Sequence, residues 1–297
     1  MSTSTVPRFS TRELQAAADA LAAGRFATSS SRRAPGVPTG SEMESIAPGQ
    51  AQTPRPVTPC AAVPDGLGPL VRVRAANAGA GASTIALALA DAADLTGIRT
   101  RVLDAAAPAW SGLLGATGTE LGAAEGWRRG RRGSNVLIDR VEEPIQLPGQ
   151  VPAPRTVDGI DLTVLDAGWT PRELAAEPAA WVASSTAHVE VLVTRPHGLA
   201  LSQTEATLAA LTDQVAAERV VVVVVGAGRW SEREFATAGR RLRTVHEQEA
   251  VLFAPLLPAK ALPGLGPDPL PKQLTNPSQR LLERITTITG PLTANRT

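Results

Sequence analysis

The sequence predicts an α/β domain with a mostly parallel sheet and helices on both faces, preceded by an arm without regular structure. Short β-branched runs such as Val220–Val225 alternate with longer helical stretches from residue 67 onward. This alternation is typical of βαβ units, whose strands are buried on both faces. A glycine-rich turn joins the first strand-like run to a helical one, and residues 27–66 show no apolar periodicity.

Composition bounds the class of protein. Of the 297 residues, 43% are apolar and few are aromatic, so the core must be built from Val, Leu, Ile and Ala. The 29 basic and 28 acidic residues nearly cancel, which argues against nucleic-acid binding by bulk charge. We expect a cytoplasmic protein without a membrane span, because no segment reaches ~20 consecutive apolar residues. Cys60 is the only cysteine, which excludes an internal disulfide.

Residues 1–66 are predicted to form a flexible arm in two parts. In residues 1–26, Ser10 and Glu13 have capping-box spacing and residues 10–24 have an apolar face, which predicts a short helix. A single short helix is marginal in water, so we weigh a frayed helix against one that docks on a protein partner. Residues 27–66 are rich in Ser, Pro and Gly and predict a disordered linker.

The elements of the folded part, residues 67–297, follow in order from the sequence. Buried strands are expected where apolar β-branched runs occur, and helices where longer stretches with alanine and leucine follow. The expected strands are 70–76, 100–106, 134–141, 160–168, 188–196, 219–228 and 249–257, and the expected helices are 83–97, 200–218, 231–248 and 276–288. The arginine-rich stretch 126–133 is read as a loop.

The glycine turn, Asn77–Thr84 with the sequence NAGAGAST, has the context of a phosphate-binding loop. Gly79 and Gly81 permit a close approach of the backbone, and the following helix aims its free N–H groups at an anion. Two later strands end in Asp104 and Asp166, and the carboxyl ends of parallel strands share one crevice. A carboxylate there could hold Mg²⁺ together with the hydroxyl of Ser83.

These features resemble the ParA/MinD family of P-loop ATPases, whose loop has the form K-G-G-x-G-K-[ST]-[ST]. The resemblance implies ATP and Mg²⁺ as cofactors, catalytic roles for Asp104 and Asp166, and metal binding by Ser83 and Asp166. It also implies a homodimer that sandwiches the nucleotide. Residues placed at the nucleotide by this resemblance are Asn77, Ala78, Gly79, Ala80, Gly81, Ala82, Ser83 and Thr84, with Lys260 as a candidate contact to the base.

The loop departs from the family pattern at both lysines. Ala82 replaces the phosphate-binding lysine, and Asn77 replaces the signature lysine. One lost charge-assisted contact, worth roughly 1.5–3 kcal/mol, should weaken nucleotide binding by roughly 10- to 100-fold. By analogy with an oxyanion donor, it should slow hydrolysis by on the order of 10²–10³. Arg72 and Arg74 precede the loop; either their heads reach water near the sheet's end, or one of them reaches the phosphate pocket.

Three functions stay open from the sequence. The first is a degenerate ParA/MinD-like protein, a pseudo-ATPase that works as an adaptor or dimerising scaffold in DNA segregation, conjugation or secretion. The second is an active ATPase in which an arginine replaces the missing lysine. The third is a module that binds DNA nonspecifically, with phosphate contacts from four arginines in the stretch 126–133. These are Arg128, Arg129, Arg131 and Arg132.

Overall fold

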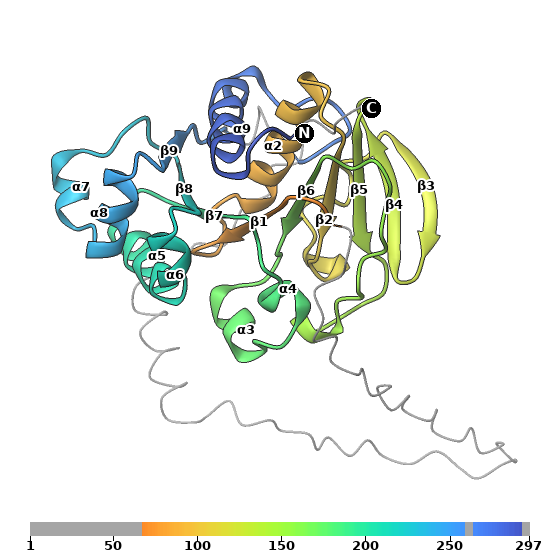
Figure 1. The fold of residues 1–297 in the computed structure, drawn as a ribbon, viewed down its shortest axis with the longest axis horizontal. Coiled ribbons are helices and arrows are strands. Elements are labelled where there is room, and N and C mark those ends of the chain that lie inside the picture. The colour runs from red at the N-terminus through yellow and green to blue at the C-terminus, as the bar shows by residue number, and fades with distance from the viewer. Residues whose placement is uncertain (1–66, 259–263, 293–297) are drawn as a thin grey trace, which may run out of the picture. The chain divides into compact units, whose positions relative to one another are not determined.

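The computed structural model describes residues 67–258 and 264–292, in which a nine-stranded sheet lies between two layers of helices (Figure 1). The predictions made for residues 1–66 and for Lys260 lie outside the described residues. The strands are β1 (Leu70–Ala75), β2 (Thr100–Asp104), β3 (Thr119–Ala124), β4 (Trp127–Arg132), β5 (Val136–Val141), β6 (Leu162–Asp166), β7 (Val189–Thr194), β8 (Val220–Val225) and β9 (Val251–Ala254).

The sheet confirms the predicted α/β class. Its strand order is β3-β4-β5-β2-β6-β1-β7-β8-β9. In this spatial order, the last seven strands, which begin with β5, are all parallel to one another. The pairings of β3 with β4 and of β4 with β5 are antiparallel, and these two strands extend the sheet beyond β5. Because the central strands run parallel, their carboxyl ends, including those of β1, β2, β6 and β7, lie along one edge.

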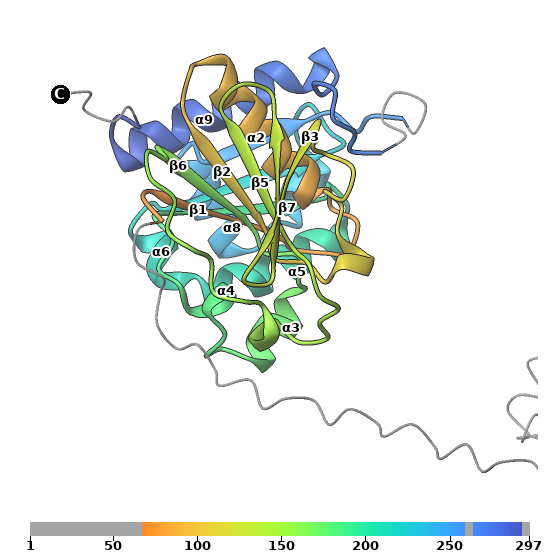
Figure 2. The same cartoon turned by 90° about the vertical axis from the view of Figure 1, so that its right-hand side faces the viewer.

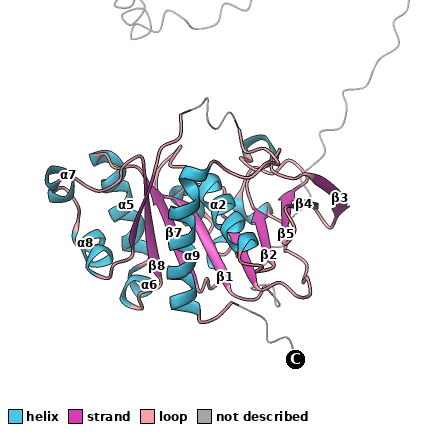
Figure 3. Ribbon diagram, turned by 90° about the horizontal axis from the view of Figure 1, so that it is seen from above, coloured by secondary structure: helices cyan, strands magenta, loops and turns pink. Residues whose placement is uncertain are grey.

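Helices cover both faces of the sheet. The helices α2 (Ala82–Leu95) and α9 (Thr275–Thr289) lie side by side on one face (Figure 3), and the others lie on the opposite face or beside it (Figure 2). These are α3 (Pro171–Ala176), α4 (Trp181–Ser184), α5 (Gly198–Ala210), α6 (Thr212–Ala216), α7 (Glu232–Ala236) and α8 (Arg240–Glu247), with 3₁₀ turns at Pro108–Trp110, Pro148–Gln150 and Lys272–Leu274.

Three sequence predictions need correction. The stretch 200–218 forms α5 and α6, which are separated at Leu211, and 231–248 forms α7 and α8, which are separated around Gly239. The arginine-rich stretch 126–133 is a strand, β4, and not a loop. Its polar sequence lacks an apolar strand pattern, but its backbone pairs with β5 on one side and with β3 on the other.

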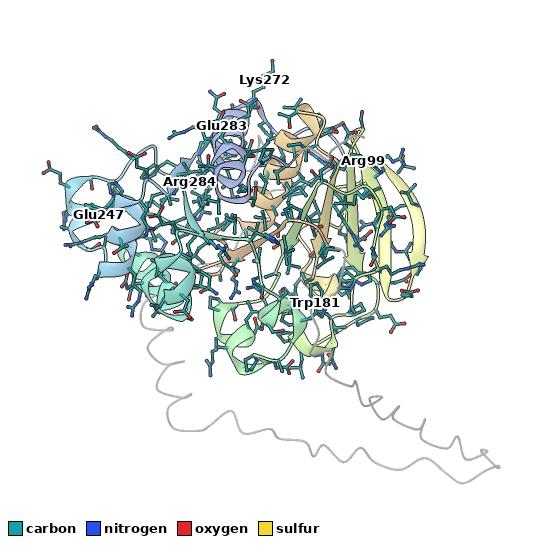
Figure 4. The ribbon with its side chains drawn as sticks, in the orientation of Figure 1. Arg99, Trp181, Glu247, Lys272, Glu283 and Arg284 are labelled. Carbon is teal, nitrogen blue, oxygen red and sulfur yellow. The ribbon has the colours of Figure 1, made fainter. Side chains whose placement is uncertain are left out.

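The core on the face opposite α2 and α9 is divided into two parts. One part packs beneath α3 and α4 and includes Trp181, the first residue of α4, which is labelled in Figure 4. The other part packs beneath α5, α6 and α8 and includes Leu201 and Leu242. On the strip of sheet between them, β1 and β7 carry three charged side chains in place of apolar ones: Arg72, Arg74 and Glu190.

In the part of the chain that the structure describes, no helix is both long enough and apolar enough to cross a membrane.

Candidate functional site

The loop between β1 and α2 has the backbone geometry of an anion cradle. Gly79 and Gly81 have φ angles of 68° and 99°, in the left-handed region that side chains disfavour. Gly81 is the N-cap of α2 and offers no side chain to the first turn of the helix. The first N–H groups of α2, together with its dipole, are therefore free to face a phosphate.

Two carboxyl groups lie beside this loop. Asp104 ends β2 and Asp166 ends β6, and the two residues are register partners in neighbouring parallel strands. Asp104 accepts hydrogen bonds from the Ser111 hydroxyl and from the Ala106 amide at 3.2 Å. Asp166 Oδ2 is buried and has no hydrogen-bond partner among the described residues. An orphaned buried oxygen of this kind needs a proton or a cation.

The environment of this pair disfavours two negative charges. Burial raises the pKa of Asp104 to about 6, against the lowering effect of the Ser111 hydroxyl. Burial and then the charge of Asp104 raise the pKa of Asp166 to about 7, while the Ser83 hydroxyl opposes the rise. Two close carboxylates share protons as a pair. Near neutral pH the pair can therefore take up either a proton or a divalent cation.

Ser83 completes the set of oxygen atoms around this position. It lies in the first turn of α2, and its Oγ would be only 2.9 Å from a Cβ at Gly112. Gly112 thus makes room for the serine side chain. No group of three or more His, Cys, Asp or Glu that could hold a metal occurs among the described residues. Two carboxylates and a hydroxyl still fit Mg²⁺, which keeps several waters and takes further oxygens from phosphates.

The loop has no cation of its own. Ala82 opens α2 at the position of the phosphate-binding lysine. The Asn77 side chain is uncharged, and its Oδ1 lies 3.3 Å from the Thr194 hydroxyl on β7. The cradle therefore offers backbone amides and a helix dipole, but no charged donor, to a bound phosphate.

The structure corrects the expectation that the heads of Arg72 and Arg74 reach water, and it places Arg74 in the lining of the cleft at the loop. Neither head lies in open water, and both are bound to the buried carboxylate of Glu190. Arg72 donates further hydrogen bonds to the carbonyls of Val182 and Ala183, which uses its guanidinium fully for structure. Arg74 Nε lies 3.0 Å from Glu190 Oε2. The partner was not apparent from the sequence, because Glu190 lies more than a hundred residues downstream.

Sequence reasoning missed one cation that contacts the loop. Arg195 follows β7, and its Nε and Nη2 lie 3.2 and 3.1 Å from the carbonyl oxygen of Gly79. Its Nη1 lies 3.5 Å from the carbonyl of Val225. Among the described residues Arg195 forms no ion pair, so it is a half-buried cation that holds the loop against β7 and β8. No motif or spacing in the sequence marks it.

A cleft of about 1930 Å³ opens at the loop. Asn77–Thr84 and Asp166 line one end of it, and Trp110 stands at its rim with 84% of its surface exposed. The segment after Asp166 is packed tightly, because the Trp169 indole donates a hydrogen bond of 2.9 Å to the Ala105 carbonyl. From the loop the cleft extends along the sheet face between α3–α4 and α5–α6.

The arginines of β4 are not one exposed cluster. Arg132 is buried and forms a bidentate ion pair with Asp91, which corrects its prediction as a DNA contact. Arg129 is half-buried and paired with the buried Asp139. Arg128 is paired with Glu142 at the surface, and Arg131 is exposed. Alternation along a strand sends neighbouring side chains to opposite faces, so the four arginines cannot form a single patch.

Together, the parallel sheet, the glycine loop before α2 and the acidic strand ends define an α/β protein of the P-loop type. Its fold is similar to that of MinD and ParA ATPases at low sequence identity. Septum-site-determining MinD from Pyrococcus horikoshii, solved with Mg-ADP, is 16% identical over 75% of this chain and 98% of its own, with a TM-score of 0.49.

Other solved structures give similar values. MinD from Pyrococcus furiosus is 20% identical over 74% of this chain and 99% of its own, with a TM-score of 0.47. A ParA-family ATPase from Chlorobium tepidum is 12% identical over 73% and 99%, with a TM-score of 0.46. No protein-family model and no curated protein matches the sequence. At these identities and scores the similarity assigns no activity to this chain.

Proposed function

We propose that this chain is a degenerate ParA/MinD-like P-loop protein that binds Mg-nucleotide weakly or not at all and does not hydrolyse it efficiently. It would act as an adaptor or dimerising scaffold in DNA segregation, conjugation or secretion. The observation that carries the proposal is the contrast between an intact cradle with its acidic pair and the missing charge at Ala82 and Asn77.

The groups that would hold Mg-ATP are the backbone of Gly79–Thr84, the Ser83 hydroxyl and the carboxylate of Asp166. The Asp166 carboxylate and the Ser83 hydroxyl would hold Mg²⁺, which would supply positive charge to the phosphates. Asp104, held by Ser111, would orient a water molecule near the metal. The charge that develops on a transferring phosphoryl group would meet no lysine, and this favours retention of a nucleotide over its turnover.

The dimer in this proposal has support in the surface around the loop. Four large apolar side chains follow the carboxyl ends of parallel strands and are more than half exposed: Trp110 and Leu114 after β2, Leu199 after β7, and Leu256 after β9. Trp110 and Leu114 both follow β2, and a contiguous exposed apolar patch marks an interaction site more often than single exposed residues do. A second copy of the chain that faces this edge would cover them.

Fewer arginines remain available for the two alternative functions. For an ATPase with an arginine in place of lysine, Arg72 is unavailable because its donors are bound to Glu190 and to carbonyls of α4. Two arginines remain: Arg74, whose Nη1 has no hydrogen-bond partner among the described residues, and Arg195, which contacts the loop. DNA binding through β4 would keep only Arg128 and Arg131 as exposed contacts.

Release of inorganic phosphate from ATP by the full chain tests the proposal. We expect a rate no higher than that of the Asp166→Ala variant at saturating Mg²⁺. A turnover that Asp166→Ala abolishes would replace the pseudo-ATPase with an active enzyme. In that case Arg195→Gln would show whether the arginine at the loop supports the reaction.

A further inference from the structure

The cleft is larger than a nucleotide requires. Small-molecule sites occupy about 300–1,000 Å³, whereas this cleft measures about 1930 Å³. The loop end suffices for a nucleotide phosphate and Mg²⁺. The other end, which we call the groove, lies between α3–α4 on one side and α5–α6 on the other, with β1 as its floor. It is not used by the proposed nucleotide chemistry.

The groove exists because one crossover connection lacks a full helix. β1 lies between β6 and β7 in the sheet, so the β6–β7 connection must pass over β1. The β1–β2 and β7–β8 connections contain helices of 14 and 13 residues, α2 and α5. The β6–β7 connection contains only the six residues of α3 and the four of α4. The strip of sheet above β1 is therefore covered only in part, by α4, in which the carbonyls of Val182 and Ala183 accept hydrogen bonds from Arg72.

The volume of the whole cleft exceeds that of a short helix. A ten-residue helix is about 15 Å long and roughly 10 Å across, so it occupies roughly 1,200 Å³. One wall is a continuous face of α5, in which Gln203, Ala206, Thr207 and Ala210 follow the i, i+3, i+4, i+7 pattern. Short side chains on such a face allow another helix to approach closely.

The floor of the groove carries an uncompensated positive charge. Arg72 and Arg74 share the single carboxylate of Glu190, whose side chain is 2% exposed. Arg72 donates further hydrogen bonds to carbonyls of α4. Arg74 Nη1, in contrast, has no hydrogen-bond partner among the described residues, and the Arg74 side chain lines the cleft. Burial lowers the pKa of Arg74 more than Glu190 raises it. A second carboxylate would complete the cluster.

We propose that the groove between α3–α4 and α5–α6 binds an α-helix of a partner protein, and that an Asp or Glu of this helix pairs with Arg74. The partner's helix would take the place of the covering helix that the β6–β7 connection lacks. Small or polar residues would face α5, and the acidic residue would face β1. This surface gives an adaptor its docking site, and it does not depend on whether nucleotide binds.

The test uses the full chain and a display library of 15-residue alanine-rich helical peptides, randomised along one face. We expect the selected peptides to carry Asp or Glu on that face. Ala206→Trp, which fills the groove from the exposed side of α5, should weaken their binding at least tenfold. Ala209→Trp is the matched control, because Ala209 is exposed on the same helix but does not line the cleft. It should bind the peptides as the wild type does.

A double-mutant cycle then tests the ion pair. Replacement of the peptide's acidic residue by its amide should weaken binding to the wild type and have little further effect on Arg74→Gln. The proposal is wrong if no peptide is selected, if Ala206→Trp binds as tightly as Ala209→Trp, or if the amide peptide binds equally well. A self-associated chain that Ala206→Trp returns to monomers would also overturn it, because the occupant would then be a second copy.

Discussion

Asp104 and Asp166 stand opposite each other at the ends of neighbouring parallel strands, and burial raises the pKa of both carboxyls. In the proposed function, this acidic pair beside the glycine loop would hold the metal of a bound nucleotide. Charged donors to phosphate would be few, because Ala82 and Asn77 carry no charge and Arg72 and Arg74 are paired with Glu190. Several expected results follow from this imbalance.

A positive charge introduced at position 82 should strengthen nucleotide binding. In Ala82→Lys, a lysine at the start of α2 would face the cradle and donate charge-assisted hydrogen bonds to phosphate. We expect affinity for an ATP analogue to rise by roughly 10- to 100-fold, measured by fluorescence titration. Ala175→Lys adds the same charge to an exposed position of α3 that also lines the cleft. If both variants gained equally, bulk charge would explain the effect.

The acidic pair should make the stability of the protein depend on pH. In the unfolded chain both carboxyls titrate near pH 4, and in the folded chain at about 6 and about 7. Between these values the folded state binds more protons, so the free energy of unfolding falls as pH rises from about 4 to 7. Asp166→Asn should therefore be more stable than the wild type at pH 7.5, by an amount on the order of a few kcal/mol.

Thermal unfolding at pH 5 and pH 7.5 measures this effect. The advantage of Asp166→Asn should shrink at pH 5, where the wild-type carboxyl is protonated. Asp213→Asn, at an exposed position of α6, controls for the loss of a charge and should follow the wild type at both pH values. An Asp166→Asn variant that is less stable than the wild type at pH 7.5 would show that the carboxylate is not strained.

Arg132 should matter for folding and not for nucleic acid. Its guanidinium is buried against Asp91 and also donates to the carbonyls of Ala116, Gly266 and Asp268. Arg132→Ala should cost about 3 kcal/mol or more, because it removes the ion pair of Asp91 and the donor of three carbonyls. Arg131→Ala, at an exposed position of β4, should change the stability by no more than about 0.5 kcal/mol. Urea unfolding compares them, and equal effects would contradict the structural role.

The exposed apolar edge around the loop should hold the scaffold's dimer. We expect Trp110→Ser to weaken self-association by roughly 30-fold, the equivalent of 2 kcal/mol for an aromatic residue at the centre of an interface. Leu95→Ser is the control, because Leu95 is 71% exposed but lies at the far end of α2 from the loop. Sedimentation velocity over a range of concentrations distinguishes them. A wild type that stays monomeric throughout would exclude this interface.

Much of the fold follows from local patterns in the sequence. The six β-branched residues of β8 can form little but a buried strand, and the acidic ends of β2 and β6 could be placed together because parallel strands end at one edge. The hairpin β3–β4 could not be predicted, because its sequence is polar and its arginines depend on partners elsewhere in the chain. Asp139, for example, pairs with both Arg101 and Arg129.

The partners of the charged residues around the loop could not be predicted from local sequence patterns either. The pairing of Arg74 with Glu190 joins β1 to β7, and the contact of Arg195 with Gly79 joins the end of β7 to the loop. Both depend on strand order, which places β7 beside β1. Sequence spacing carries no information about such neighbours, so the question of a substitute for the missing lysine needed the three-dimensional arrangement.

Equilibrium binding of a fluorescent ATP analogue to the full chain, with and without Mg²⁺, tests the central claim most directly. A cradle without a cation predicts no saturable binding at micromolar nucleotide, and at most weak binding that requires Mg²⁺. Magnesium-dependent binding at micromolar affinity would contradict the account, and it would mean that another group, such as Arg195, meets the phosphate charge.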